Sequence, residues 1–379
     1  MSRVALAPDR VLLPTGFESE RVVVVEEGRI AAVSTRPEIP PTDLVVLEGD
    51  LLPGFIDLQV NGGGDVLFND QPTAEGVTAI AQAHRRFGTT GLFPTLISDD
   101  LSVVKRAIAA VEAAIGAGAP GVLGIHLEGP FLNPERKGIH DAGKFRVLDA
   151  AAVELLTSLR GGKTLITLAP ERAPPEAVRA LAERGAVIAA GHTAATYQQT
   201  LDGVGEGLTG FTHLYNAMSQ LGSREPGAVG AALSLRQTWA GLIVDGHHVH
   251  PASLQVALAA KGADRLALVT DAMPTVGSDR KWFMLGGRRI TAEDGRCLAE
   301  DGTLAGSDLD MAQAVRNAVR LMGVDLATAA RMASTVPAAV MGLADLTGAV
   351  RPGLRADFVL LDSSGEVRRT WIGGQPSPA

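Results

Sequence analysis

Four short segments carry the residue types needed for hydrolytic chemistry, and each follows a short apolar run. The segments are His126-Leu-Glu-Gly-Pro-Phe131, Gly191-His-Thr193, Thr212-His-Leu-Tyr-Asn-Ala-Met218 and Val269-Thr-Asp-Ala-Met273. They supply Glu128, His192 and His213 as ligands for a metal ion, and Asp271 as a separate proton-transfer group. Hydrolysis at one metal requires three protein ligands, an open position for water and a neighbouring base. The segments together therefore predict a metal-dependent hydrolase.

The elements that position these residues follow an alternating pattern. Apolar runs typical of buried strands lie at 54–60, 88–95, 121–128, 165–170, 186–191, 209–214, 240–245 and 266–271. Helical patterns separate most of them, and further helices are predicted at 309–322 and 326–341. Eight alternating strand–helix units predict an α/β fold of the (β/α)8, TIM-like barrel type. Residues 281–303 are predicted to form a charged β-hairpin insert in the eighth unit.

Both ends of the chain contain short β-branched runs between turn residues instead, such as Val22–Val25 and Asp357–Leu361. They predict a small β-sandwich domain built from residues 1–52 and 346–379. The catalytic barrel is then expected to span residues 53–345.

The four candidate residues fall at the carboxyl ends of predicted strands three, five, six and eight, where barrel enzymes carry their active sites. His192 and His213 lie 21 residues apart, which is about one strand–helix unit. Each histidine taken alone is better explained as a strand-end side chain hydrogen-bonded to the backbone. As a set on one rim, they favour a metal site. One oxygen and two nitrogen ligands suit Zn²⁺ first, and also Fe²⁺, Co²⁺ or Mn²⁺.

Composition excludes several other classes. The chain has 379 residues, of which 46% are hydrophobic and 44 are glycine, as in a compact α/β enzyme. Aromatic residues make up 4%, and the net charge of −8 has no basic block to offset it, which argues against nucleic-acid binding. Cys297 is the single cysteine, so no intrachain disulfide can form. The amino terminus lacks the apolar core of a signal peptide, and no run reaches the roughly 18 apolar residues of a membrane span. We expect a cytoplasmic enzyme that does not contact a membrane.

Pro53-Gly-Phe-Ile-Asp57 followed by this order of ligands resembles the amidohydrolase superfamily. Many members follow that aspartate with His-x-His and bridge two metals through a carbamylated lysine on strand four. Here the corresponding positions are Gln59 and Asn61, and 165–170 contains no lysine. The resemblance therefore implies one divalent metal per subunit.

Within the superfamily, the chain resembles the family of N-acetylglucosamine-6-phosphate deacetylases along its whole length. The resemblance rests on the four opening segments together with Arg224-Glu-Pro-Gly227 and Asp245-Gly-His-His248. It implies hydrolysis of N-acetyl-D-glucosamine 6-phosphate to D-glucosamine 6-phosphate and acetate. Asp271 would act first as general base and then as general acid; its alternative role is to orient a ligand histidine. His140 would polarise the carbonyl.

The sugar phosphate would be held by residues away from the metal. The candidates are Asn216, the backbone N–H of Ala217, Arg224 and His248, although His247 and His250 compete with His248 on sequence grounds. In the resembled family the matching arginine reaches the site of the neighbouring subunit, which implies a homodimer.

Three alternatives remain open at this stage. The first is the same reaction on N-acetyl-D-galactosamine 6-phosphate, since one inverted hydroxyl leaves no mark on the sequence. The second is a cyclic-amide hydrolase or deaminase, which Gln59 and Asn61 disfavour. The third is a non-catalytic scaffold, which the retained metal ligands and Asp271 disfavour.

Overall fold

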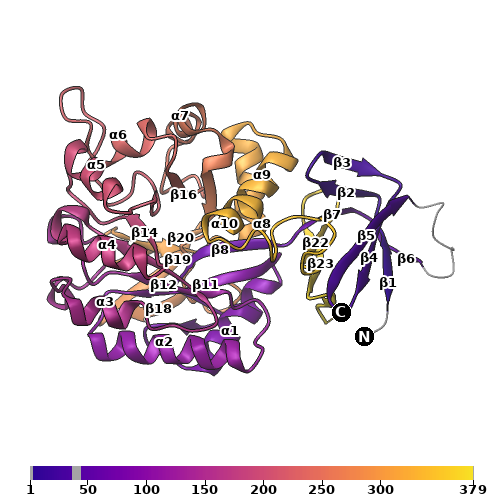
Figure 1. Cartoon of the computed structure of the whole chain (residues 1–379), viewed down its shortest axis with the longest axis horizontal. Helices are drawn as coiled ribbons and strands as arrows, with labels where there is room; N and C mark the ends of the chain where they lie inside the picture. Colours follow the sequence, from indigo (N-terminus) through magenta and orange to yellow (C-terminus); the bar gives the residue numbers. More distant parts are fainter. Residues whose placement is uncertain (1–2, 36–43, 379) are drawn as a thin grey trace.

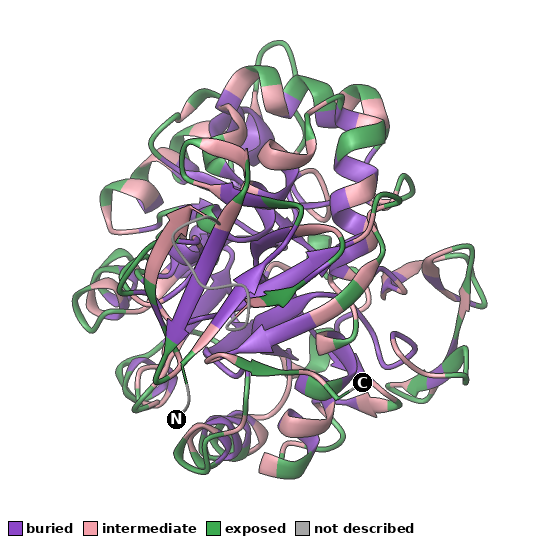
Figure 2. Ribbon diagram, turned by 90° about the vertical axis from the view of Figure 1, so that its right-hand side faces the viewer, coloured by how far each residue is buried: buried purple, intermediate pink, exposed green. Residues whose placement is uncertain are grey.

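The computed structural model describes residues 3–35 and 44–378, and it consists of a large barrel beside a smaller β unit (Figure 1). Eight parallel strands form the barrel sheet in chain order, which confirms the predicted barrel. The strands are β8 (Phe55–Val60), β11 (Thr89–Ile97), β12 (Gly124–Glu128), β13 (Lys163–Leu168), β14 (Val187–Ala190), β15 (Gly210–Phe211), β16 (Trp239–Ile243) and β17 (Leu266–Val269). Nearly every residue of these strands is buried, because helices cover the outside of the barrel and side chains fill its inside. Figure 2 is seen from the side of the smaller β unit, many of whose strand residues are buried as well.

The segment after the last strand closes the barrel onto the first. Val60 and Ala272 form an isolated parallel bridge. The Asp271 N–H donates to the Gln59 carbonyl at 3.0 Å, and the Asn61 N–H donates to the Ala272 carbonyl at 2.8 Å. Residues more than 200 positions apart are thereby held side by side at one rim.

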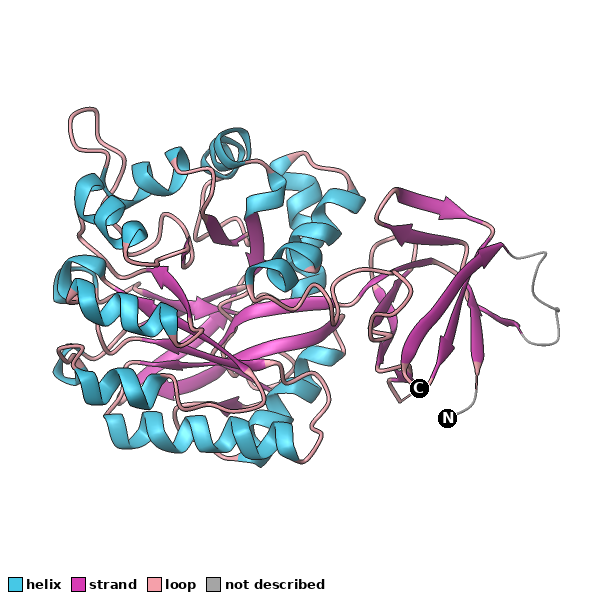
Figure 3. Ribbon diagram, in the orientation of Figure 1, coloured by secondary structure: helices cyan, strands magenta, loops and turns pink. Residues whose placement is uncertain are grey.

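Helices form the outer layer of the barrel (Figure 3). They are α1 (Ala74–Arg85), α2 (Leu101–Gly116), α3 (Ala150–Leu156), α4 (Pro175–Glu183), α5 (Tyr197–Gly205), α6 (Gly227–Ser234), α7 (Pro251–Lys261), α8 (Met311–Asn317), α9 (Leu326–Ala333) and α10 (Thr335–Val340). Several begin at a Thr or Asp that accepts a hydrogen bond from the first turn, as Thr73 does from Gly76. Among the described residues, no helix is long and apolar enough to cross a membrane.

Two predicted helices differ in the structure. The helix expected at 309–322 ends its α-helical part at Asn317 and continues as a π-helical turn, Ala318–Met322. The helix expected at 326–341 is interrupted at Ser334. Pro337 explains this interruption, because a proline ring clashes with the carbonyl four residues earlier in a continuous helix. The sequence pattern did not predict α5 and α6.

Strands from both ends of the chain form the smaller unit as two sheets. One sheet contains β1 (Val4–Ala7), β4 (Arg21–Glu26), β5 (Arg29–Thr35) and β6 (Leu44–Val46). The other contains β2 (Arg10–Leu13), β3 (Gly16–Ser19), β7 (Asp50–Pro53), β22 (Phe358–Leu361), β23 (Val367–Ile372) and β24 (Gln375–Pro376). A cluster that includes Leu6, Val23, Leu51 and Phe358 fills the space between them. Of the predicted terminal domain, residues 1–2, 36–43 and 379 lie outside the described residues.

The predicted hairpin at 281–303 is wrong in extent, because the insert is a four-stranded antiparallel sheet. Its strands are β18 (Trp282–Leu285), β19 (Arg288–Glu293), β20 (Arg296–Ala299) and β21 (Leu304–Ser307). The turn between β19 and β20 is Asp294-Gly295, and both residues have positive φ, as two-residue hairpins require. Phe283 and Ile290 of this sheet pack on Leu67 and Met273 at the barrel rim. A further two-stranded ribbon, β9 (Gly62–Gly63) and β10 (Val66–Leu67), follows β8.

Candidate active site

The barrel brings all four candidate residues to one rim. Glu128 is the last residue of β12, whereas His192, His213 and Asp271 each lie two residues beyond the end of their strands. These last three have left-handed backbone conformations, with φ of 48°, 33° and 53°. Such conformations are uncommon outside glycine and are maintained by the surrounding fold, often at functional sites. The shared geometry directs the three side chains into one cavity.

Three atoms of the kinds that bind metals converge within that cavity. Glu128 Oε1 lies 3.2 Å from His192 Nε2 and 3.0 Å from His213 Nε2, and the two Nε2 atoms are 3.2 Å apart. His192 Nδ1 donates to the Arg136 carbonyl at 2.7 Å, so its Nε2 presents a lone pair. Ligands about 2.05 Å from a tetrahedral zinc lie about 3.3 Å from one another. The triangle therefore fits a bound divalent metal.

His140 lies beside this triangle, and its ring centroid is 4.4 Å from that of His192. Ligand atoms of Glu128, His140 and His192 lie within 4.8 Å of one another, so His140 competes with His213 as a ligand. The Ser98 backbone N–H donates to His140 Nδ1 at 3.3 Å, which leaves the proton of a neutral ring on Nε2. Burial lowers the pKa of His140 to about 3, so the ring stays neutral. His140 is therefore better suited to donate a hydrogen bond than to bind a metal.

The two carboxylates of the cavity are affected differently by their surroundings. Burial by itself would raise the pKa of Glu128, but its close contacts with the imidazoles of His192 and His213 outweigh burial and hold the pKa well below its usual value. Removal from water and the charge of Glu128 raise the pKa of Asp271 to about 6. Glu128 is thus suited to remain a charged ligand, and Asp271 is suited to exchange a proton near neutral pH.

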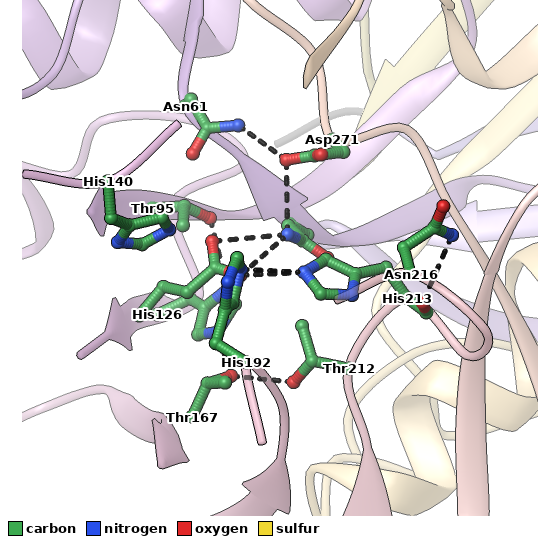
Figure 4. Close-up of polar contacts among 12 residues, drawn as sticks. Asn61, Thr95, His126, His140, Thr167, His192, Thr212, His213, Asn216 and Asp271 are labelled. Carbon is green, nitrogen blue, oxygen red and sulfur yellow. Dashed lines mark hydrogen bonds and ion pairs between the residues drawn. The ribbon is translucent and has the colours of Figure 1, made fainter. Parts of the chain in front are cut away.

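Two amide side chains hold Asp271, one from β8 and one from just after its end. Figure 4 shows the contact between Asn61 and Asp271. Asn61 Nδ2 donates to Asp271 Oδ1 at 2.6 Å, and Gln59 Nε2 donates to the same oxygen at 3.0 Å. The sequence analysis treated these amides only as weak metal ligands and missed this contact. Gln59 and Asn61 are two residues apart, so both side chains point to the same face of an extended segment. That spacing could have predicted that both face the inside of the barrel.

A second layer of polar side chains lies below the cavity, and the sequence analysis missed it as well. His126 Nδ1 is 3.2 Å from Thr95 Oγ1, and His126 Nε2 is 2.8 Å from Thr167 Oγ1. Thr167 in turn contacts Thr212, the neighbour of His213, at 2.6 Å (Figure 4). Burial lowers the pKa of His126 to about 4. This neutral chain of hydrogen bonds links β11, β12 and β13 to the end of β15 beneath the site.

The cavity has a volume of about 230 Å³. Asn216, Ala217 and His248 line it, together with Asn61, Glu128, His140, His192, His213 and Asp271. His248 Nδ1 contacts Asp245 Oδ2 at 2.5 Å. Its two competitors lie elsewhere: His247 contacts the Asp294 carbonyl, and His250 accepts a hydrogen bond from Ala252 at the start of α7.

Arg224 does not line this cavity and is exposed on the loop before α6. Its predicted role in binding the substrate therefore stays a prediction.

Residues 51–376 match the amidohydrolase family, which is most of the chain. The chain belongs to the amidohydrolase family. An N-acetylgalactosamine-6-phosphate deacetylase of Shewanella sp. (strain ANA-3) is 44% identical to this amidohydrolase over 86% of the chain and 83% of the relative. An N-acetylglucosamine-6-phosphate deacetylase of Haemophilus influenzae is 32% identical over 93% of both chains. The structure of a Mycobacterium smegmatis N-acetyl-D-glucosamine-6-phosphate deacetylase variant with N-acetyl-D-glucosamine 6-phosphate superposes with a TM-score of 0.90 at 33% identity, covering 99% of each chain.

Proposed function

We propose that this amidohydrolase removes the acetyl group of N-acetyl-D-glucosamine 6-phosphate, releasing D-glucosamine 6-phosphate and acetate. The observation that carries the proposal is the convergence of Glu128, His192 and His213 beside a carboxylate of raised pKa. That set of groups serves hydrolysis of an unactivated amide. The similar deacetylases, which the chain matches over nearly its full length, support this choice of substrate.

Each residue of the cavity has a step in this reaction. A divalent metal held by Glu128, His192 and His213 would polarise the acetyl carbonyl and lower the pKa of water. Asp271 accepts the proton of the attacking water as the new carbon–oxygen bond forms. The Nε2–H of His140 donates to the carbonyl oxygen as it gains negative charge. Asp271 then gives its proton to the sugar nitrogen, and the carbon–nitrogen bond breaks.

The phosphate end of the substrate is assigned to the opposite wall of the cavity. Asn216, the N–H of Ala217 and His248 supply hydrogen-bond donors there, and Arg224 of a second subunit supplies a positive charge. This assignment includes a homodimer. Zinc is the first choice of metal, since the spacing of one oxygen and two nitrogen atoms suits a tetrahedral ion. We place the enzyme in the cytoplasm, where phosphorylated amino sugars are formed and used.

The galactosamine epimer is a second candidate substrate. The 44% identical relative is named for that reaction, and it is more similar to this chain than the Haemophilus enzyme is. A scaffold without activity is disfavoured, because Glu128, His192, His213 and Asp271 all line the cavity.

Acetate release by enzyme of known metal content tests the proposal. The substrates are N-acetylglucosamine 6-phosphate, N-acetylgalactosamine 6-phosphate and unphosphorylated N-acetylglucosamine. We expect fast turnover of the first and slow turnover of the last. Faster turnover of the galactosamine phosphate would establish the second candidate, and equal turnover of both glucosamine compounds would remove the phosphate-binding roles. No turnover by fully metallated enzyme would contradict the deacetylase reaction.

A further inference from the structure

The amide side chain of Gln59 lies between the two carboxylates of the cavity, and that of Asn61 contacts one of them. Gln59 Nε2 is 3.2 Å from Glu128 Oε2, 3.4 Å from Glu128 Oε1 and 3.0 Å from Asp271 Oδ1. One amide nitrogen thus reaches the carboxylate of the proposed metal ligand and that of the proposed base. Asn61 Nδ2 contacts Asp271 alone, at 2.6 Å. Within residues 3–35 and 44–378, no hydrogen bond joins Asn61 to Glu128.

The backbone holds this arrangement rigidly. The bonds that close the barrel join Gln59 to Asp271 and Asn61 to Ala272, so both amides and the carboxylate belong to one paired segment. Below them, the Asp57 carboxylate accepts from Thr270 Oγ1 at 2.5 Å and from the Gln59 N–H at 3.1 Å. Gln59 and Asn61 are each only 2% exposed. The amide groups therefore have few alternatives to the positions they occupy.

The cost of this arrangement indicates a purpose other than stability. Asn61 Oδ1 is buried and has no hydrogen-bond partner among the described residues. A buried acceptor without a partner costs about 1–3 kcal/mol. An apolar side chain at this position would remove that cost, but it would also leave Asp271 with one donor fewer.

We propose that Gln59 and Asn61 are positioning residues with different tasks: Gln59 couples the orientation of the metal ligand Glu128 to that of Asp271, and Asn61 orients Asp271 alone. The inference deepens the proposed function and rests on it. Both amides are neutral and donate only through nitrogen, so Gln59 can hold the two carboxylates close together without adding a negative charge to the site. Hydrogen bonding from Asn61 also opposes the rise in the pKa of Asp271.

The test compares Gln59→Met and Asn61→Ala with a control, Thr89→Val. Thr89 is a buried residue of β11 whose hydroxyl has no partner, and it lies at the opposite end of its strand from the site. The measurements are the Zn²⁺ dissociation constant, by competition with a chromogenic chelator, and kcat and KM for N-acetylglucosamine 6-phosphate. Circular dichroism and a thermal melt check that each variant is folded.

Gln59→Met is expected to weaken Zn²⁺ binding by about 10- to 100-fold and to lower kcat of the fully metallated enzyme by about tenfold or more. Asn61→Ala is expected to lower kcat by about tenfold or more, with the Zn²⁺ dissociation constant and KM within about threefold of wild type. Thr89→Val should leave all three constants within about twofold. If Gln59→Met does not fold, Gln59→Glu keeps the shape, replaces the donor by an acceptor, and should show the same two losses.

Two results would overturn the inference. One is a Gln59 variant that binds Zn²⁺ and turns over substrate like the Thr89→Val control. The other is an Asn61→Ala enzyme that loses Zn²⁺ affinity as strongly as Gln59→Met. Failure of the proposed function gives a different result from failure of this inference. In that case the wild-type enzyme would release no acetate, but Gln59→Met would still bind Zn²⁺ more weakly than wild type.

Discussion

Glu128 and Asp271 are carboxylates of one cavity, yet the two sides of that cavity are built differently. On the Glu128 side, two imidazole nitrogens lie about 3 Å from a single carboxylate oxygen, so three atoms of the kinds that bind metals lie together. On the Asp271 side, two amide N–H groups converge on one oxygen, so donors meet an acceptor. The first arrangement calls for a cation, and the second does not. The pKa values differ as well: the contacts with the two histidines lower that of Glu128, whereas burial and the charge of Glu128 raise that of Asp271 to about 6, against the hydrogen bond from Asn61. Two carboxylates of one cavity thus take separate roles from their neighbours.

Replacing the carboxylate on the cation side should have the largest effect. Glu128→Gln keeps the shape but removes the negative charge between the two histidines, so we expect loss of the metal and a fall in kcat of more than about 10⁴-fold. Metal content by plasma mass spectrometry and acetate release measure both effects. A variant that retains one metal per subunit would remove Glu128 from the ligand set.

Replacing the carboxylate on the donor side should leave the metal in place. For Asp271→Asn we expect a fall in kcat of about 10²- to 10⁴-fold at unchanged metal content, because the proton acceptor is lost and the ligands are intact. The wild-type rate should also decline below about pH 6, since protonation of Asp271 removes the base as pH falls through its raised pKa. Loss of metal from this variant would instead support the alternative role of orienting a ligand histidine.

His140 lies beside the cation side but should behave as a donor. His140→Phe keeps a ring and removes the Nε2–H, so we predict a decrease in kcat of about 10²- to 10³-fold with metal content unchanged. The same variant distinguishes the two candidate third ligands. If metal binding falls as much as in His213→Phe, then His140 is a ligand.

Asp57 is a third buried carboxylate near the cavity, and no imidazole of the described residues forms a hydrogen bond with it. It is fully buried below Gln59, and burial raises its pKa to about 7. A raised folded-state pKa contributes stability that is fully present below about pH 4 and is lost as pH rises through about 7. We expect Asp57→Asn to gain about 4 kcal/mol relative to wild type between pH 4 and pH 8. Urea denaturation at several pH values measures the difference, and parallel pH dependences would show that Asp57 is ionised in the folded protein.

The barrel and the place of the catalytic residues were predictable from local pattern. Eight apolar runs in alternation with helical stretches indicate a parallel barrel, and Glu128, His192, His213 and Asp271 follow four of those runs. The extent of the insert and the interruption at Ser334 were not predicted, because turn residues and Pro337 override the surrounding periodicity. The strand predicted at 209–214 is only two residues long in the structure, as β15. Beyond Phe211 the chain leaves the extended conformation and turns into the cavity, which the apolar pattern did not indicate.

The sequence by itself determined which chemical groups are present and at which end of each strand they lie, because strand alternation and strand ends are local properties. Only the tertiary structure decided which groups touch. Barrel closure brings Gln59 and Asn61 to Asp271 across more than 200 residues, and three left-handed backbone conformations direct His192, His213 and Asp271 inward. The tertiary structure also distinguishes His248, which lines the cavity, from His247 and His250, which do not. Contacts of this kind depend on how the chain closes in space, and no spacing along the sequence contains that information.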